Sequence, residues 1–229
     1  MENVHTGHRK RLKERFINEG LDNFNDHQVL ELLLFFSIPR KDTNNLAHLL
    51  LNRYGSLSAI FEQDPLELTK IEGIGENSAI LLSLISQISR RYIFDKTKSK
   101  QQLKDVESAK EYIKSLFIGR TNEVFYIVSL DTQLNVIQPY LLFEGTVKEA
   151  AVYPRKVVEV ALRFNASNVI IAHNHPAGSL KPSLEDIKTT QKIVNALSAI
   201  SVKVCDHIIV GNNNAYSFAQ NSILPEPEI

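Results

Sequence analysis

The chain has 229 residues, 43% of them hydrophobic and 23% charged, which is enough to bury a sizeable core in one large domain or two small ones. Its 26 basic and 26 acidic side chains cancel and neither half is basic overall, which excludes a strongly basic nucleic-acid-binding chain. No apolar run reaches the roughly 18 residues of a membrane span, the N-terminus lacks a secretory hydrophobic segment, and a single cysteine forms no internal disulfide. We therefore expect a cytoplasmic protein with no membrane partner.

The first hundred residues carry Leu and Ile at helical spacing. This spacing predicts helices over residues 25–36, 44–54, 65–70 and 76–94. The polar stretch that follows, residues 95–102, predicts a linker. We therefore expect an all-helical domain over residues 1–100.

Within this domain, Asp64-Pro65 predicts the start of a short helix, and the turn Gly73-Ile74-Gly75 separates it from a longer helix that starts at Glu76. The pattern resembles a helix-hairpin-helix, in which glycine lets backbone N–H groups approach a phosphate. Glu72 and Glu76 flank the turn, where a phosphate binder would profit from Lys or Arg. Weak DNA binding and a protein-docking or structural role therefore both remain open. Basic side chains that would favour DNA gather in residues 9–15 and 90–100.

The second half, residues 104–229, contains both the apolar spacing typical of helices and the pattern typical of strands. It predicts strands over residues 123–130, 136–143, 169–172 and 202–210 and a last strand around Tyr216. Helices are expected over residues 108–118, 154–164 and 183–200. Adjacent strands together with crossover helices favour a mixed α/β sheet with helices packed on it.

A metal-binding pattern closes the apolar strand of residues 169–172. His173 and His175 are two residues apart, so on an extended backbone their imidazoles share a face and reach one point. Pro182-Ser183 predicts a helix entry, which leaves Asp186 in the first helical turn as a third ligand. Three protein ligands and one water are typical of catalytic zinc, and the single cysteine argues against a closed structural site.

Each part of this pattern has a simpler alternative. Ser183 and Asp186 have the spacing of a capping box, in which Asp186 would only satisfy backbone donors. His173 and His175 would then be strand-end residues with ordinary hydrogen-bond partners. The full combination of strand, H-x-H-P, turn, P-S-x-x-D and amphipathic helix favours a shared purpose.

The residues around this site resemble a known family. The run from His173 to Gly178, H-N-H-P-A-G, followed by P-S-x-x-D, is similar to the JAMM (MPN+) metalloprotease signature. Further stretches resemble bacterial RadC proteins, so the resemblance covers essentially the whole chain. These stretches are Gly7-His8-Arg9, Tyr153-Pro154-Arg155, Phe164-Asn165-Ala166 and residues 205–211. The resemblance implies a helix-hairpin-helix domain followed by a mixed α/β JAMM/MPN domain of the cytidine-deaminase-like type.

The same resemblance implies a Zn²⁺ cofactor and a peptidase or isopeptidase acting on a protein or peptide substrate. JAMM enzymes use an upstream glutamate to move the proton, and Glu123, at the start of a predicted strand, matches that position. Glu144 is the competing carboxylate. Ser183 would donate a hydrogen bond to the oxyanion.

The sequence bears on two other functions. The RadC resemblance also implies a DNA-associated repair or recombination factor whose zinc site is not catalytic. A zinc nucleobase deaminase would need H-x-E and P-C-x-x-C, which Cys205 alone cannot supply.

Overall fold

The structure is a computed structural model that describes residues 4–39, 41–97, 101–145 and 154–228. The chain divides into two compact units, Met1–Ser89 and Arg90–Ile229. This division falls earlier than the expected one between residues 1–100 and 104–229. The helix α6 (Glu76–Thr97) continues through the first residues of the expected linker, because Asp95, Lys96 and Thr97 include no Gly or Pro that would end it. Residues 98–100 of that linker lie outside the described residues.

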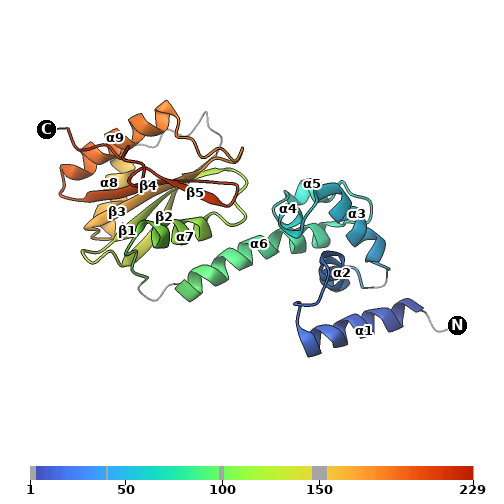
Figure 1. Ribbon diagram of the computed structural model, residues 1–229. Coiled ribbons are helices and arrows are strands. Elements are labelled where there is room, and N and C mark those ends of the chain that lie inside the picture. Colours follow the sequence, from blue (N-terminus) through green and yellow to red (C-terminus); the bar gives the residue numbers. More distant parts are fainter. Residues whose placement is uncertain (1–3, 40, 98–100, 146–153, 229) are drawn as a thin grey trace. The chain divides into compact units, whose positions relative to one another are not determined.

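The first unit is helical, as expected. Its helices are α1 (Val4–Glu19), α2 (Asp26–Ser37), α3 (Asn44–Tyr54), α4 (Leu57–Phe61), α5 (Pro65–Leu68) and the first part of α6 (Figure 1). The helices α1 and α4 were not predicted. Apolar side chains from α2 to α6 form one core, in which Leu30, Leu34, Leu50, Ile60 and Leu82 are fully buried.

Polar contacts attach α1 to α2 and to the loop after it. The imidazole of His8 lies 2.9 Å from the carboxylate of Glu31, whose side chain is buried. The guanidinium of Arg9 donates to the backbone carbonyls of Ile38 and Pro39 at 2.6 and 2.9 Å. In this structure His8 and Arg9 of the Gly7-His8-Arg9 stretch therefore hold a helix in place.

The expected turn between two helices is present between α5 and α6. Asp64 caps α5 by accepting a hydrogen bond from the backbone N–H of Leu66 at 2.7 Å. Gly73 has a φ of +92°, a left-handed conformation that favours glycine. Ile71 and Ile74 anchor the turn in the core. Its assignment as a helix-hairpin-helix stays a prediction.

The second unit is a mixed α/β domain, which confirms the predicted fold class. Its helices are α7 (Val106–Leu116), α8 (Pro154–Arg163) and α9 (Leu184–Ser198). Its strands are β1 (Glu123–Leu130), β2 (Val136–Gly145), β3 (Asn168–Asn174), β4 (Lys203–Gly211) and β5 (Asn214–Ser217). In the described residues these strands form one sheet in the order β2-β1-β3-β4-β5. Only β3 and β4 pair in parallel, and α9 connects them.

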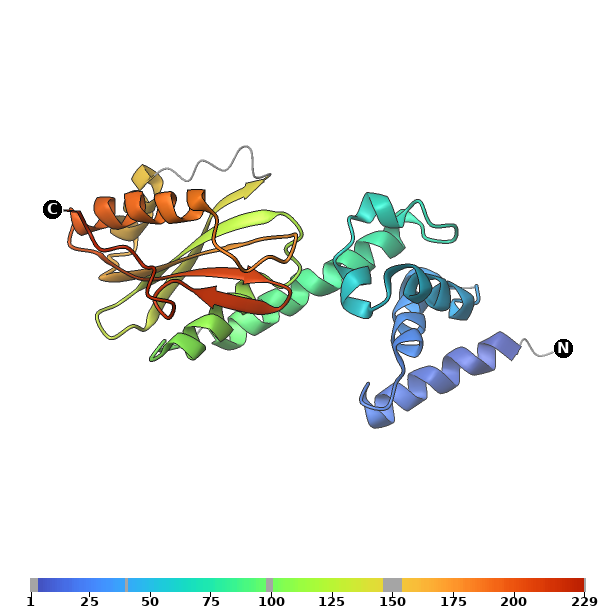
Figure 2. The same cartoon turned by 45° about the horizontal axis from the view of Figure 1, so that its top comes forward.

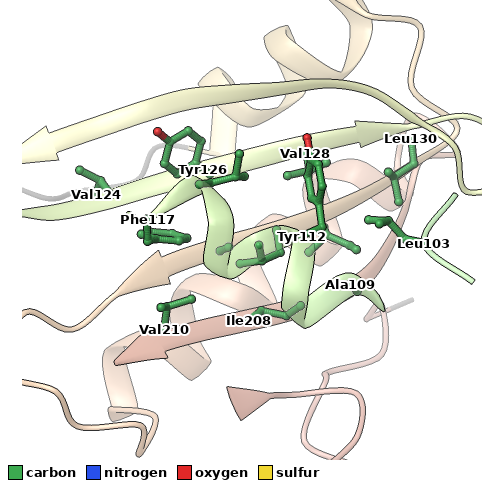
Figure 3. Close-up of a cluster of buried hydrophobic side chains, with 14 residues drawn as sticks. Leu103, Ala109, Tyr112, Phe117, Val124, Tyr126, Val128, Leu130, Ile208 and Val210 are labelled. Carbon is green, nitrogen blue, oxygen red and sulfur yellow. The ribbon is translucent and has the colours of Figure 1, made fainter. Parts of the chain in front are cut away.

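Helices cover both faces of this sheet. The helix α7 lies on one face, and α8 and α9 lie on the other (Figures 1 and 2). On the α7 face, Tyr112 and Phe117 pack over Tyr126, Val128 and the neighbouring apolar side chains of β4 (Figure 3). A strand covered on both sides reads as a continuous apolar run, which explains why residues 169–172 are all buried.

Within the described part of the chain, no helix is both long and apolar enough to cross a lipid bilayer. Tyr153, which belongs to one of the stretches that resemble RadC, lies outside the described residues.

Candidate metal centre

The two histidines of the H-x-H pattern come together at the end of β3. Their Nε2 atoms are 3.0 Å apart. The side chain of His173 is buried, whereas that of His175 is 21% exposed, so the site lies at the surface with one ligand in the interior and one in contact with solvent. The strand pairing continues past β3, because the backbone N–H of His175 donates to the carbonyl of Val210 at 2.9 Å.

Asp186 reaches both histidines from α9. Its Oδ1 lies 3.3 Å from Nε2 of His173, and its Oδ2 lies 3.6 Å from Nε2 of His175. One ligand atom from each of these three residues lies within 4.8 Å of the others, so they form a group that could hold a metal ion. The structure therefore brings together all three side chains for which the sequence predicts metal binding.

Ser183 and Asp186 also form the capping box that was the alternative interpretation. Oγ of Ser183 accepts from the backbone N–H of Asp186 at 3.1 Å, and Oδ2 of Asp186 accepts from the backbone N–H of Ser183 at 2.6 Å. The two interpretations do not exclude each other. The cap holds the Asp186 carboxylate in the orientation that faces the histidines.

The pKa values of Asp186 and His175 are shifted in opposite directions. Burial opposes ionisation of Asp186, but the imidazoles of His173 and His175 beside its carboxylate outweigh it and hold the pKa of its carboxyl well below the usual range. The neighbouring carboxylate of Asp186 raises the pKa of His175, although partial burial of the ring opposes this. Asp186 is therefore an anion that stabilises positive charge at this point, as a cation ligand must be.

His175 has a fixed tautomer. Its Nδ1 lies 2.8 Å from the backbone carbonyl of Ser179, and a carbonyl oxygen only accepts, so Nδ1 carries the proton. The lone pair on Nε2 then points towards His173 and Asp186. Two imidazole nitrogens and one carboxylate, with a fourth position left to the cavity, fit the donor set of catalytic zinc.

The loop that carries His175 and Ser179 packs closely on the end of β4. Gly178 has a φ of +83°, and its backbone N–H donates to the carbonyl of His175 at 2.8 Å. A Cβ built on Gly211 would lie 2.8 Å from the carbonyl oxygen of Gly178 and 3.2 Å from that of Ser179. Glycine at 211 therefore lets the loop take this position.

Glu123 shares a cavity with the histidines. The cavity has a volume of about 200 Å³ and is lined by Glu123, Phe125, Phe143, His173, His175, Ser183, Glu185, Asp186, Thr189 and His207. Glu144 is not among the residues that line it. The structure thus brings Glu123 and Ser183 to the predicted site and keeps the competing Glu144 away from it.

Asn174, between the two histidines, was not predicted to have a role. Successive side chains of a strand point to opposite faces, so the Asn174 amide turns away from the cavity. It accepts from the backbone N–H of Val124 at 2.8 Å and donates to the carbonyl of Asn122 at 3.0 Å. These two bonds bracket Glu123 and fix its backbone against the end of β3.

Two further residues missed by the sequence analysis lie behind His173. Its Nδ1 is 2.8 Å from Nε2 of His207, and Nδ1 of His207 is 2.6 Å from Oγ1 of Thr190. His207 pairs with Ile171 in the parallel register, two residues before His173, so the two rings share one face of the sheet. His207 belongs to the stretch 205–211 that resembles RadC, and that was the only signal for it in the sequence.

Comparisons with known proteins agree with this architecture. Residues 103–223 match the model of the RadC-like JAB domain, and residues 5–80 match the model of the UPF0758 N-terminal domain. A UPF0758 protein of Fusobacterium nucleatum is 34% identical over 95% of this chain and 97% of its own length. A UPF0758 protein of Vibrio cholerae is 36% identical over 91% of this chain and 93% of its own length. The chain therefore belongs to the RadC family and combines its JAB domain with a UPF0758 N-terminal domain.

Proposed function

We propose that this protein is a zinc-dependent hydrolase that cleaves a peptide or isopeptide bond in a protein or peptide substrate. The observation that carries the proposal is the convergence of His173, His175 and Asp186 in the cavity that also contains Glu123. RadC-like JAB domains support a metal-dependent hydrolase at this coarser level.

The proposed ligands are Nε2 of His173, Nε2 of His175 and the carboxylate of Asp186. Zinc held there would lower the pKa of its bound water to about 7 and would polarise the carbonyl group of the substrate. The ionised state of Asp186 and the fixed tautomer of His175 support this assignment. The small cavity leaves room for the reacting group, while the rest of a substrate would lie outside it.

Glu123 is the proposed proton carrier. It takes a proton from the attacking water and returns it to the leaving nitrogen, so the cleaved bond is replaced by an acid and an amine. A general base must keep its position relative to the water, and the hydrogen bonds of Asn174 to residues 122 and 124 provide that position.

Ser183 is the proposed donor to the oxyanion. Its Oγ accepts a hydrogen bond from the backbone of Asp186, which leaves the hydroxyl proton available for an oxygen of the substrate. Capping of α9 and donation to the substrate therefore use different parts of one hydroxyl group.

The test is hydrolysis by the zinc-loaded full-length protein across a library of folded peptides and isopeptide conjugates. We expect the wild type to cleave at least one of them and Glu123→Gln to keep the zinc while losing at least 100-fold in turnover, since an amide cannot carry the proton. Equal turnover by the wild type and Glu123→Gln would remove Glu123 as the base. A zinc-loaded wild type that cleaves nothing in the library would favour the alternative, a DNA-associated repair or recombination factor with a non-catalytic zinc site.

A second candidate function belongs to the N-terminal unit, namely weak and sequence-indifferent DNA binding through residues 73–75. The observation that favours it is the bare backbone of this turn. Gly73 is left-handed, and a Cβ built on Gly75 would meet no atom within 4 Å, so a phosphate group can approach the chain there. Lys70, the basic residue nearest the turn in sequence, adds little attraction for a phosphate, because its ammonium pairs with the Glu67 carboxylate at 2.5 Å.

A further inference from the structure

We propose that Thr190 and His207 are positioning residues that set the tautomer of His173 and so direct its Nε2 lone pair to the metal position. This inference rests on the proposed metal site. Thr190 and His207 are both buried, and neither is one of the three proposed ligands.

The hydroxyl group of Thr190 has two hydrogen-bond partners. Its Oγ1 lies 2.6 Å from the backbone carbonyl oxygen of Asp186 and 2.6 Å from Nδ1 of His207. A carbonyl oxygen only accepts, and a hydroxyl group has one proton to donate. The Thr190 proton therefore goes to Asp186, and Oγ1 accepts from His207. Nδ1 of His207 must carry a proton.

The ring of His207 is enclosed by the protein. The residue is only 1% exposed, and the rings of Phe125 and Phe218 pack on it at centroid distances of 5.9 and 4.5 Å. Burial among aromatic rings disfavours the imidazolium, so the ring is neutral and has one proton. Because that proton is on Nδ1, Nε2 of His207 is an acceptor.

His173 lies beside this acceptor nitrogen. Its Nδ1 lies 2.8 Å from the acceptor Nε2 of His207, so Nδ1 of His173 is the donor. Its own Nε2 then presents a lone pair, and this atom lies 3.0 Å from Nε2 of His175 and 3.3 Å from Oδ1 of Asp186. Three acceptors that face one another at these distances repel unless a cation lies between them.

The hydrogen bonds also join two ligands to each other. They run from the backbone of Asp186 through Thr190 and His207 to the ring of His173. A metal-binding histidine usually donates its second N–H to a carboxylate, a carbonyl or water. Here the acceptor is a second imidazole, whose own tautomer is set by one threonine hydroxyl. The orientation of His173 therefore depends on a residue that no metal or substrate touches.

The test uses Thr190→Val, which keeps the shape of the side chain and removes the hydroxyl, and Thr190→Ser, which restores it. Long-range ¹H–¹⁵N NMR of metal-free protein at pH 9 reports the tautomer of each histidine. We expect His173 to be protonated on Nδ1 in the wild type and in Thr190→Ser, and to shift towards Nε2–H in Thr190→Val. Zinc affinity, measured by competition with a chelator, should fall about 10- to 100-fold in Thr190→Val and less than about 3-fold in Thr190→Ser.

A second pair of variants acts on the acceptor itself. His207→Phe removes it, and His207→Gln places an amide oxygen near the position of Nε2, so zinc affinity should fall in the first and recover in the second.

A purely structural role would lower the melting temperature of Thr190→Val without moving the tautomer of His173, and that result would overturn the proposal. If wild-type protein binds no zinc, the proposed function fails, but the tautomers of the metal-free protein still decide the role of Thr190. If zinc binding is normal and the tautomer does not respond, only this inference fails.

Discussion

Glu144 and Glu123 lie on opposite faces of the sheet. In the antiparallel pairing of β1 with β2, Glu144 is opposite Val124, so it points to the same side as Val124 and away from Glu123. Its carboxylate pairs with the guanidinium of Arg120 at 2.9 Å. The alternation of one strand therefore separates two carboxylates that the sequence alone left in competition.

This separation makes Glu144→Gln the matched control for Glu123→Gln. We expect Glu144→Gln to keep zinc content and turnover, because its side chain does not line the cavity. The lost ion pair is 41% exposed at Glu144, so unfolding should become easier by no more than about 1 kcal/mol. Turnover and thermal unfolding of both variants, measured side by side, check this. A loss of turnover in Glu144→Gln, with the fold intact, would contradict the assignment of Glu123.

Metal content tests the ligand set directly. We expect about one zinc per chain in the purified protein, as typical of a site with three protein ligands. His175→Ala should lose the zinc and stay folded, because the chain around it is held by backbone pairing with Val210. Asp186→Asn should bind zinc more weakly, because the amide carries no negative charge. Elemental analysis and circular dichroism before and after dialysis against a chelator measure both effects, and unchanged zinc in His175→Ala would remove the assignment.

Ser183 allows its two roles to be separated. As an N-cap, Ser→Ala costs about 1 kcal/mol, whereas Ser→Gly costs only a few tenths. We therefore expect Ser183→Ala to be less stable than Ser183→Gly, and both to lose a similar factor in turnover, because both lack the hydroxyl group. Denaturant unfolding and single-turnover kinetics give the two quantities. Turnover that follows stability instead of the hydroxyl group would reduce Ser183 to a helix cap.

DNA binding by the N-terminal unit should be weak and should fall as salt rises, because phosphate contacts release counterions. Glu72→Lys should strengthen it and Gly75→Asp should weaken it, since both change the charge beside the exposed turn. Glu226→Lys makes the same charge change as Glu72→Lys, but at an exposed side chain of the other unit, and serves as the control. Fluorescence anisotropy with a labelled duplex at low and moderate salt measures the affinities. If no binding is seen even at low salt, the unit is better regarded as a docking or structural module.

Local patterns predicted the parts of the fold that depend on local sequence. The buried strand before His173 and the cap at Ser183 follow from residue order alone. The helix α1 was missed because its sequence is mostly polar, and contacts such as that of His8 with Glu31 hold it. The expected linker includes the last three residues of the helix α6, because a polar stretch resembles a loop even where a helix continues through it.

The site was predictable where its residues are close in sequence and unpredictable where the fold brings them together. His173, His175 and Asp186 lie within one short motif. His207 reaches His173 only through the parallel pairing of β3 with β4, and Thr190 reaches His207 only because α9 packs against β4. Residue order alone left Glu123 and Glu144 open; the family resemblance favoured Glu123, and the register of β1 and β2 is what places the two carboxylates on different faces.

Gly211 shows how a residue without a side chain can determine the geometry of a site that it does not line. A methyl group at this position would meet backbone atoms of residues 178 and 179, which cannot turn aside as a flexible side chain could. The loop would have to shift as a whole and take with it the carbonyl group that fixes the tautomer of His175. A genetic screen for inactive variants would therefore recover substitutions at 211 among those of the ligands, although the defect would be one of shape and not of reactivity.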